Sequence, residues 1–188
     1  YVSTKVNVHM DFWAFTNKLS DPLFKKYKID CIDKAYCMRI INQLFGIPTA
    51  VDFVPHYPTK ENRHYWTIIR DHRFVNSKYY YANTPYTAKV YRKTGFINPI
   101  PVDEHNFIPR FIRDPYKTDV TEEYENVARL EYKFETCQPD TKYAYLCVFN
   151  NLAWNEVAWG EMRRGKVTFE KIGRDIVYMP CYYHGNSQ

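Results

Sequence analysis

Residues 31–48 read CIDKAYCMRIINQLFGIP, and this stretch decides which fold the sequence predicts. Its apolar positions are Ile32, Ala35, Tyr36, Ile40, Ile41, Leu44 and Phe45. They recur close to the 3.6-residue period of an α-helix. Asp30 is a favourable N-cap before this pattern, Gly46 is a favourable stop after it, and Pro48 prevents continuation. The pattern therefore predicts a helix over residues 31–45, with Cys31 at its start.

Cys31 stands where a nucleophilic thiol is expected. Free N–H groups and the helix dipole stabilise negative charge at a helix start, and thiols there often have lowered pKa values. His64 begins a strand candidate over residues 64–70, and a catalytic base needs to be near the thiol only in space. A packed cysteine and a surface histidine are the alternative interpretation of the same residues. Cys31 and His64 are the candidate catalytic pair.

Strand candidates occupy much of the remaining chain. Those near the helix are residues 49–54, 64–70 and 78–82, and those after residue 119 are 128–134, 143–149, 156–159, 166–170 and 175–183. Turn signals separate the later group at intervals of about ten residues, which is typical of a sandwich or barrel. Four prolines within residues 95–118 indicate an ordered connector between the two groups.

The spacing around the candidate pair resembles the transglutaminase-like superfamily. Members carry a nucleophilic Cys at a helix N-terminus, then a Gly-Ile-Pro turn and a His-x-Trp strand. Here Gly46-Ile47-Pro48 begins fifteen residues after Cys31, and His64-Tyr65-Trp66 supplies the strand. The later residues are similar to exported Bacteroidetes proteins in which such a core precedes a β-sandwich.

The resemblance implies an α+β fold in three parts. Residues 1–90 would form a transglutaminase-like core, in which the nucleophile helix packs on antiparallel strands. Residues 91–118 would form a Pro-rich connector, and residues 119–188 an all-β sandwich-like region. The chain begins at Tyr1, so we expect a processed chain or fragment, incomplete at its N-terminus, of an exported, periplasmic or cell-surface protein.

The third member of the site is open at the level of sequence. The superfamily usually has Gly two residues before the nucleophile, where this chain has Ile29, and commonly an Asp on the strand after the His. Asn83 would face His64 across a hairpin, and Asn can orient a catalytic imidazole. Asp71 is the rival, and a site without a third member is the remaining possibility.

The resemblance implies a cysteine peptidase, amidase or acyltransferase that acts on a peptide, protein or glycoprotein through a thioester. It implies neither a metal nor an organic cofactor. His56, Tyr57, Arg63 and Trp66 are candidates for a substrate cleft, although the first three also fit a solvated loop and Trp66 also fits core packing. The alternative function is a catalytically weak or inactive module that binds glycan or protein. Trp154 and Trp159 would be its sugar-contacting residues, or core aromatics of the sandwich.

Composition sets further bounds. The 188 residues carry a net charge of +5, but the basic residues are scattered, whereas a nucleic-acid groove needs a basic stripe with stacking aromatics. The five cysteines form no CxxC pair, and their odd number leaves at least one thiol free within a single chain. No apolar run approaches the roughly 20 residues that span a bilayer. The sequence therefore argues against a nucleic-acid partner and a transmembrane segment, and leaves the oligomeric state open.

Overall fold

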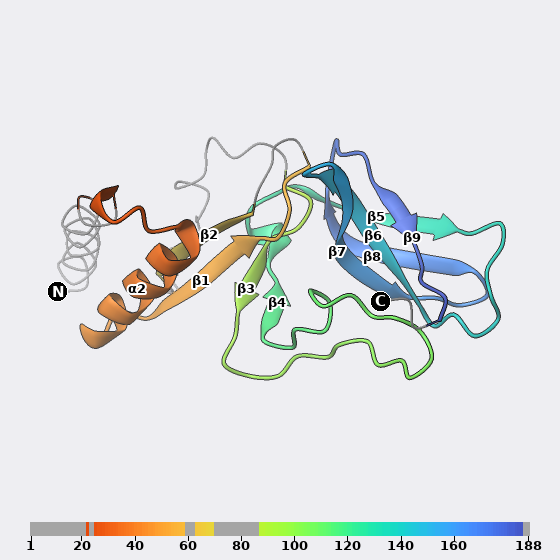
Figure 1. Cartoon of the computed structure of the whole chain (residues 1–188), viewed down its shortest axis with the longest axis horizontal. Coiled ribbons are helices and arrows are strands. Elements are labelled where there is room, and N and C mark those ends of the chain that lie inside the picture. The colour runs from red at the N-terminus through yellow and green to blue at the C-terminus, as the bar shows by residue number, and fades with distance from the viewer. Residues whose placement is uncertain (1–21, 23–24, 59–62, 70–86, 186–188) are drawn as a thin grey trace. The chain divides into compact units, whose positions relative to one another are not determined.

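The computed structural model describes residues 22, 25–58, 63–69 and 87–185 (Figure 1). The chain divides into two compact units. The first comprises Tyr1–Asp52 and His64–Val75, and the second comprises Phe53–Arg63 and Asn76–Gln188. Within the described residues one long helix accompanies mostly antiparallel strands, which confirms the α+β class at this coarse level. The predicted boundaries near residues 90 and 118 stay a prediction.

The first unit is built on the predicted helix. Helix α2 spans Cys31–Leu44, and the Asp30 carboxylate caps it by accepting hydrogen bonds from two first-turn N–H groups. Gly46 adopts a φ of +73°, the left-handed conformation in which glycine ends helices without steric cost. The strands of this unit are β1 (Thr49–Val54), whose last two residues belong to the second unit, and its neighbour β2 (His64–Ile69). The local signals therefore predicted these starts and stops well.

The buried face of α2 differs from the predicted one. Ala35, Met38 and Asn42 are buried, whereas Leu44 is 80% exposed. Ile40 and Phe45 are also exposed, so the predicted apolar stripe is only partly right. Cys37, on the same helix, is exposed as well. The cause is that this helix carries apolar side chains around much of its circumference, and packing against β2 selects one stripe among them (Figure 1).

The second unit begins with short strands. Strand β3 (Tyr91–Lys93) pairs antiparallel with β4 (Lys117–Asp119), with Tyr91 opposite Asp119. On its other side, β3 neighbours β1. The Pro-rich segment thus has a strand at each end, which its prolines did not indicate. The 3-10 turn η2 (Thr121–Glu123) follows β4.

Two small sheets complete the second unit. Their strands are β5 (Val127–Lys133), β6 (Tyr143–Asn150), β7 (Ala153–Glu161), β8 (Lys166–Gly173) and β9 (Met179–Cys181). Strand β5 pairs with β8, and β6 lies between β7 and β9. Leu146 of β6, Ala158 of β7 and Phe169 of β8 share one buried cluster. Both sheets therefore contribute residues to one shared buried cluster.

Candidate functional site

Cys31 is the first residue of α2, as predicted, and its side chain is partly exposed. The N–H groups of Ile32 and Asp33 each donate to Asp30 Oδ1 at 2.9 Å. The N–H of Lys34 donates to the Asp30 carbonyl at 3.0 Å. Among the described residues, the N–H of Cys31 is therefore the one first-turn donor without a hydrogen bond. This donor lies on the same residue as the thiol.

His64 is the first residue of β2 and is half-buried. Its imidazole stacks on the indole of Trp66, with ring centroids 5.8 Å apart and an interplanar angle of 23°. Trp66 is buried, which agrees with its interpretation as core packing behind the histidine. The stack restricts the orientation of the imidazole plane.

The elements that carry Cys31 and His64 pack together within the first unit. The Thr67 hydroxyl donates to the carbonyl of Ala35 at 3.3 Å, one helical turn beyond Cys31. Side chains alternate along a strand, so His64 and Trp66 share one face of β2 and Thr67 points to the other. The helix therefore contacts β2 on the face opposite to the one that carries His64. The structure brings the two elements together but does not aim the imidazole directly at α2.

The other predicted site residues fall in different places. Asn83 and Asp71, the two candidates for the third member, lie outside the described residues. Tyr57 is buried, and its carbonyl accepts a hydrogen bond from Asn150 Nδ2 at 2.7 Å. Burial lowers the pKa of His56, against the opposing effect of its hydrogen bond to Asn150. His56, Tyr57 and Arg63 all belong to the second unit, and Arg63 is exposed.

The acidic turn at residues 103–105 has a local structural role. Asp103 Oδ1 accepts hydrogen bonds from the N–H groups of His105 and Asn106, and its Oδ2 accepts one from the Asn106 amide. These bonds shape a turn of the chain. Among the residues with described positions, no group of three or more His, Cys, Asp or Glu side chains is placed to hold a metal ion.

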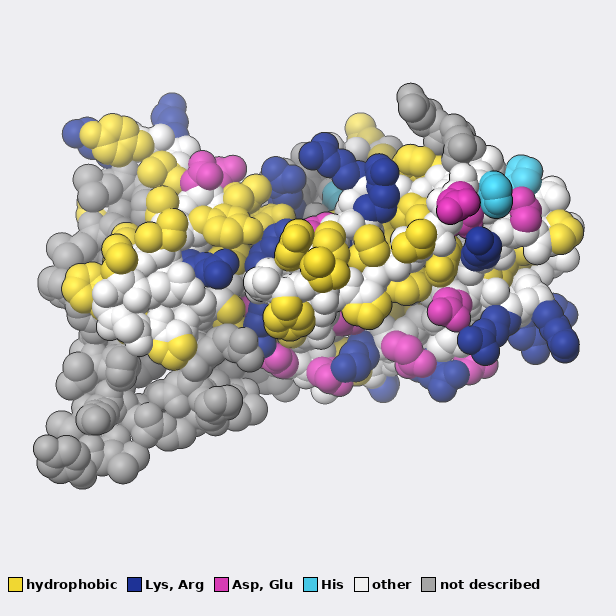
Figure 2. All heavy atoms as spheres, turned by 90° about the horizontal axis from the view of Figure 1, so that it is seen from below, with side chains coloured by type: hydrophobic (Ala, Val, Ile, Leu, Met, Phe, Trp, Pro, Cys, Tyr) yellow, Lys and Arg dark blue, Asp and Glu magenta, His cyan; other side chains and the backbone are white. Residues whose placement is uncertain are grey.

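The charged surface is mixed. Lys and Arg side chains are interspersed with Asp and Glu on the face shown in Figure 2. Several of the basic groups are paired, as in the ion pairs Arg92–Glu123 at 2.6 Å and Lys93–Asp114 at 2.7 Å.

A second cluster of reactive groups was not predicted. Cys147 Sγ on β6 lies 3.3 Å from Cys181 Sγ on β9. Glu156 of β7 is opposite Cys147 and accepts a hydrogen bond from the Tyr183 hydroxyl. The two cysteines are more than thirty residues apart in sequence, so only the strand pairing reveals their contact.

No family model, no curated protein and no solved structure matches the chain. In the part of the chain that the structure describes, no helix has the length and apolar character needed to cross a membrane.

Proposed function

We propose that this protein is a transglutaminase-like cysteine peptidase, amidase or acyltransferase, with Cys31 as nucleophile and His64 as its acid–base partner. The observation that carries the proposal is the arrangement at the start of α2. There the partly exposed thiol and an N–H group without a hydrogen bond among the described residues belong to the same residue. Acyl transfer needs both a nucleophile and a donor aimed at the developing oxyanion.

The chemistry follows from these groups. The Cys31 thiol passes its proton to His64, the sulfur attacks the carbonyl carbon of a carboxamide or peptide, and the negative charge moves to the carbonyl oxygen. The N–H of Cys31 stabilises that oxygen, as a backbone donor of an oxyanion hole does. His64 gives a proton to the leaving amine, and the C–N bond breaks to leave a thioester. Water or a second amine then attacks the thioester and restores the thiol, which yields hydrolysis or transfer.

The orientation of His64 is the demanding part of the proposal. Its side chain starts on the face of β2 opposite to Thr67, the residue that contacts α2. The pair forms if the imidazole turns toward the start of α2. A catalytic hydrogen bond that tightens only in the substrate complex would complete it.

An activated ester tests the proposal without knowledge of the natural substrate. We expect 4-nitrophenyl acetate to give a burst of 4-nitrophenolate and an acetyl group on Cys31, followed by slower turnover as the thioester hydrolyses. Cys31→Ser should lose the burst. Cys37→Ser is the matched control, because Cys37 is an exposed thiol on the same helix, and it should keep the burst. A burst that survives in Cys31→Ser, or equal acetylation of Cys37, would remove the enzyme proposal.

A separate observation favours the glycan-binding alternative. Phe149 and Trp154 pair edge to face near the β6–β7 turn, with ring centroids 5.5 Å apart, and are 49% and 38% exposed. Trp159 instead packs on the buried cluster around Tyr145. Exposed aromatic faces stack on the apolar face of a sugar ring. Trp154 is therefore the sugar-contacting residue of this alternative.

Titration with soluble β-glucan and chitin oligosaccharides, followed by tryptophan fluorescence, tests that alternative. Trp154→Ala should abolish binding. Tyr132→Ala should preserve it, because Tyr132 is also an exposed aromatic but lies on β5. If no oligosaccharide binds the wild-type chain, or if binding survives in Trp154→Ala, the sugar-binding role is refuted.

A further inference from the structure

We propose that Cys147 and Cys181 form a reversible disulfide that fastens the short strand β9 to the central strand β6. This site lies wholly within the second unit and does not depend on any role of Cys31. The inference rests on the contact of the two sulfurs, the register of their strands and the difference in their exposure.

The geometry suits a cross-strand disulfide. The sulfurs are 3.3 Å apart, so a movement of about 1.3 Å brings them to bonding distance. Cys181 is opposite Tyr145 and Cys147 is opposite Met179, so the two cysteines are diagonal neighbours across the β6–β9 pair. Their sulfurs are already in contact. Diagonal neighbours lie about 7–8 Å apart across a strand pair, so closure of the bond also draws the two backbones together.

The other cysteines have no such partner among the described residues. Cys31 and Cys37 lie on the same helix and are separated by roughly 9 Å along its axis, which is too far for a disulfide. Cys137 Sγ contacts Met162 Sδ at 3.0 Å and the carbonyl of Gln138. The pairing of Cys147 with Cys181 is therefore selective.

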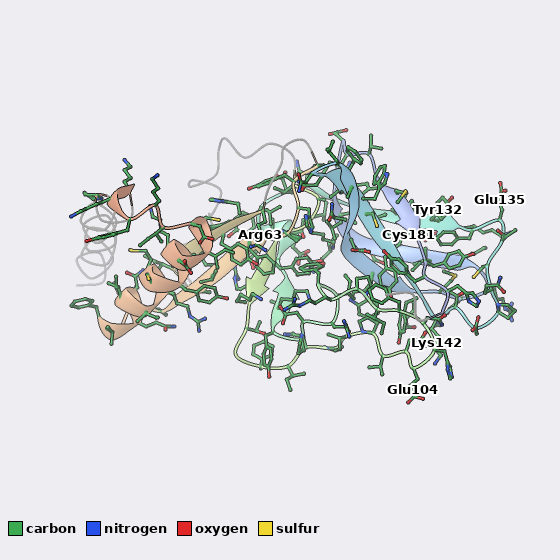
Figure 3. All side chains as sticks on the ribbon, viewed as in Figure 1. Arg63, Glu104, Tyr132, Glu135, Lys142 and Cys181 are labelled. Atoms are coloured by element: carbon green, nitrogen blue, oxygen red, sulfur yellow. The ribbon has the colours of Figure 1, made fainter. Side chains whose placement is uncertain are left out.

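The two thiols have different roles because their surroundings differ. Cys147 is only 1% exposed, whereas Cys181 is partly exposed on the outer strand of its sheet (Figure 3). The hydrogen bond between them lowers the pKa of Cys181 and raises the pKa of Cys147. Glu156 opposes ionisation of both. Cys181 is thus the thiol that an external reagent reaches, and Cys147 is the thiol that resolves the product.

The reaction is a thiol–disulfide exchange with a small-molecule disulfide such as oxidised glutathione. The Cys181 thiolate attacks one sulfur of glutathione disulfide, forms a mixed disulfide and releases one glutathione thiolate. Cys147 then attacks the Cys181 sulfur, its proton passes to the departing sulfur, and a second glutathione leaves. Two protein thiols are oxidised by two electrons, and one glutathione disulfide is reduced to two thiols.

Mass spectrometry of the full chain tests the proposal. The protein is treated with oxidised glutathione, unfolded, alkylated with iodoacetamide and digested without reductant. We expect one linked pair of peptides that contains Cys147 and Cys181, about 2 Da lighter than the two thiol peptides, and its loss after dithiothreitol. Cys31, Cys37 and Cys137 should be recovered without disulfide links to another cysteine of the chain. Absence of the linked pair, or a link to another cysteine, would overturn the proposal.

Single variants test the order of attack. In Cys147→Ser the mixed disulfide has no resolving thiol, so glutathione should stay on Cys181. In Cys181→Ser the buried Cys147 should remain a thiol. The control Cys137→Ser should form the Cys147–Cys181 link as the wild type does. Faster glutathione attachment to Cys147 in Cys181→Ser than to Cys181 in Cys147→Ser would refute the assigned roles.

Discussion

Asp30 links the stability of α2 to the reactivity of Cys31, and two substitutions separate these effects. The carboxylate accepts two first-turn hydrogen bonds and places a negative charge beside the thiol. Asp30→Asn keeps an oxygen acceptor and removes the charge. Asp30→Ala removes both. Because Asn is as good an N-cap as Asp, the two variants isolate the charge from the cap.

The magnitudes follow from the cap geometry. Loss of an N-cap costs about 1 kcal/mol, so Asp30→Ala should lower the free energy of unfolding by that amount. Asp30→Asn should change it by only a few tenths, because only the favourable interaction with the helix dipole is lost. A carboxylate roughly 6 Å from a thiolate repels it by about 0.7 kcal/mol in water. Loss of this repulsion should speed the alkylation of Cys31 about threefold, by the same arithmetic.

Urea unfolding followed by circular dichroism measures the first effect, and alkylation by iodoacetamide at pH 6.5 measures the second. Cys37 provides the internal reference, since it is exposed and lies nearly two turns into the same helix. We expect Cys31 to react about three times faster in Asp30→Asn than in wild type, with the rate of Cys37 unchanged. An unchanged or slower Cys31 with an unchanged Cys37 would refute the electrostatic reasoning.

Three further predictions concern the second unit. Oxidation of Cys147 and Cys181 closes a loop of about 35 residues and should raise the free energy of unfolding by about 4 kcal/mol. Urea unfolding with and without dithiothreitol measures this change, and equal free energies in the two conditions would contradict the prediction. Burial lowers the pKa of Lys117 to about 8, so above that pH the unfolded chain binds more protons than the folded chain. The free energy of unfolding should therefore rise from pH 8 to 10 in wild type, and rise less in Lys117→Met. Parallel plots of this free energy against pH for the two proteins would contradict the prediction. A Cβ at Gly173 would lie 2.0 Å from a backbone oxygen, so Gly173→Ala should lower the free energy of unfolding by about 1–3 kcal/mol. Gly95 has open space around it, so Gly95→Ala should be nearly neutral in the same assay. Equal effects of the two substitutions would contradict the packing.

Local signals in the sequence predicted the helix and its neighbouring strand because their causes lie within a few residues. Asp30 bonds to the N–H groups two and three positions ahead, and Gly46 and Pro48 act at the helix end itself. Strand β1 was also predicted at its observed bounds. These features needed no knowledge of distant contacts.

Features set by tertiary packing were less accessible. The exposure of Leu44 and Cys37 depends on which stripe of α2 meets β2. Strands β3 and β4 have three residues each, too few for an alternating pattern to appear. The face on which His64 lies follows from the register of β2, and the Cys147–Cys181 contact follows from the β6–β9 pairing. The sequence predicted which residues are candidates for the site, but the directions of their side chains depend on how distant strands pair.

The pairing of Cys31 with His64 is tested most directly by the pH profile of alkylation in wild type and in His64→Gln. The ratio of the Cys31 rate to the Cys37 rate is followed with iodoacetamide from pH 5 to 9, by mass spectrometry of the labelled peptides. We expect Cys31 to react faster than Cys37 below about pH 7, although it is the less exposed thiol, and to lose this advantage in His64→Gln. A ratio at or below one across the range in wild type, or a ratio that His64→Gln leaves unchanged, would contradict the pair.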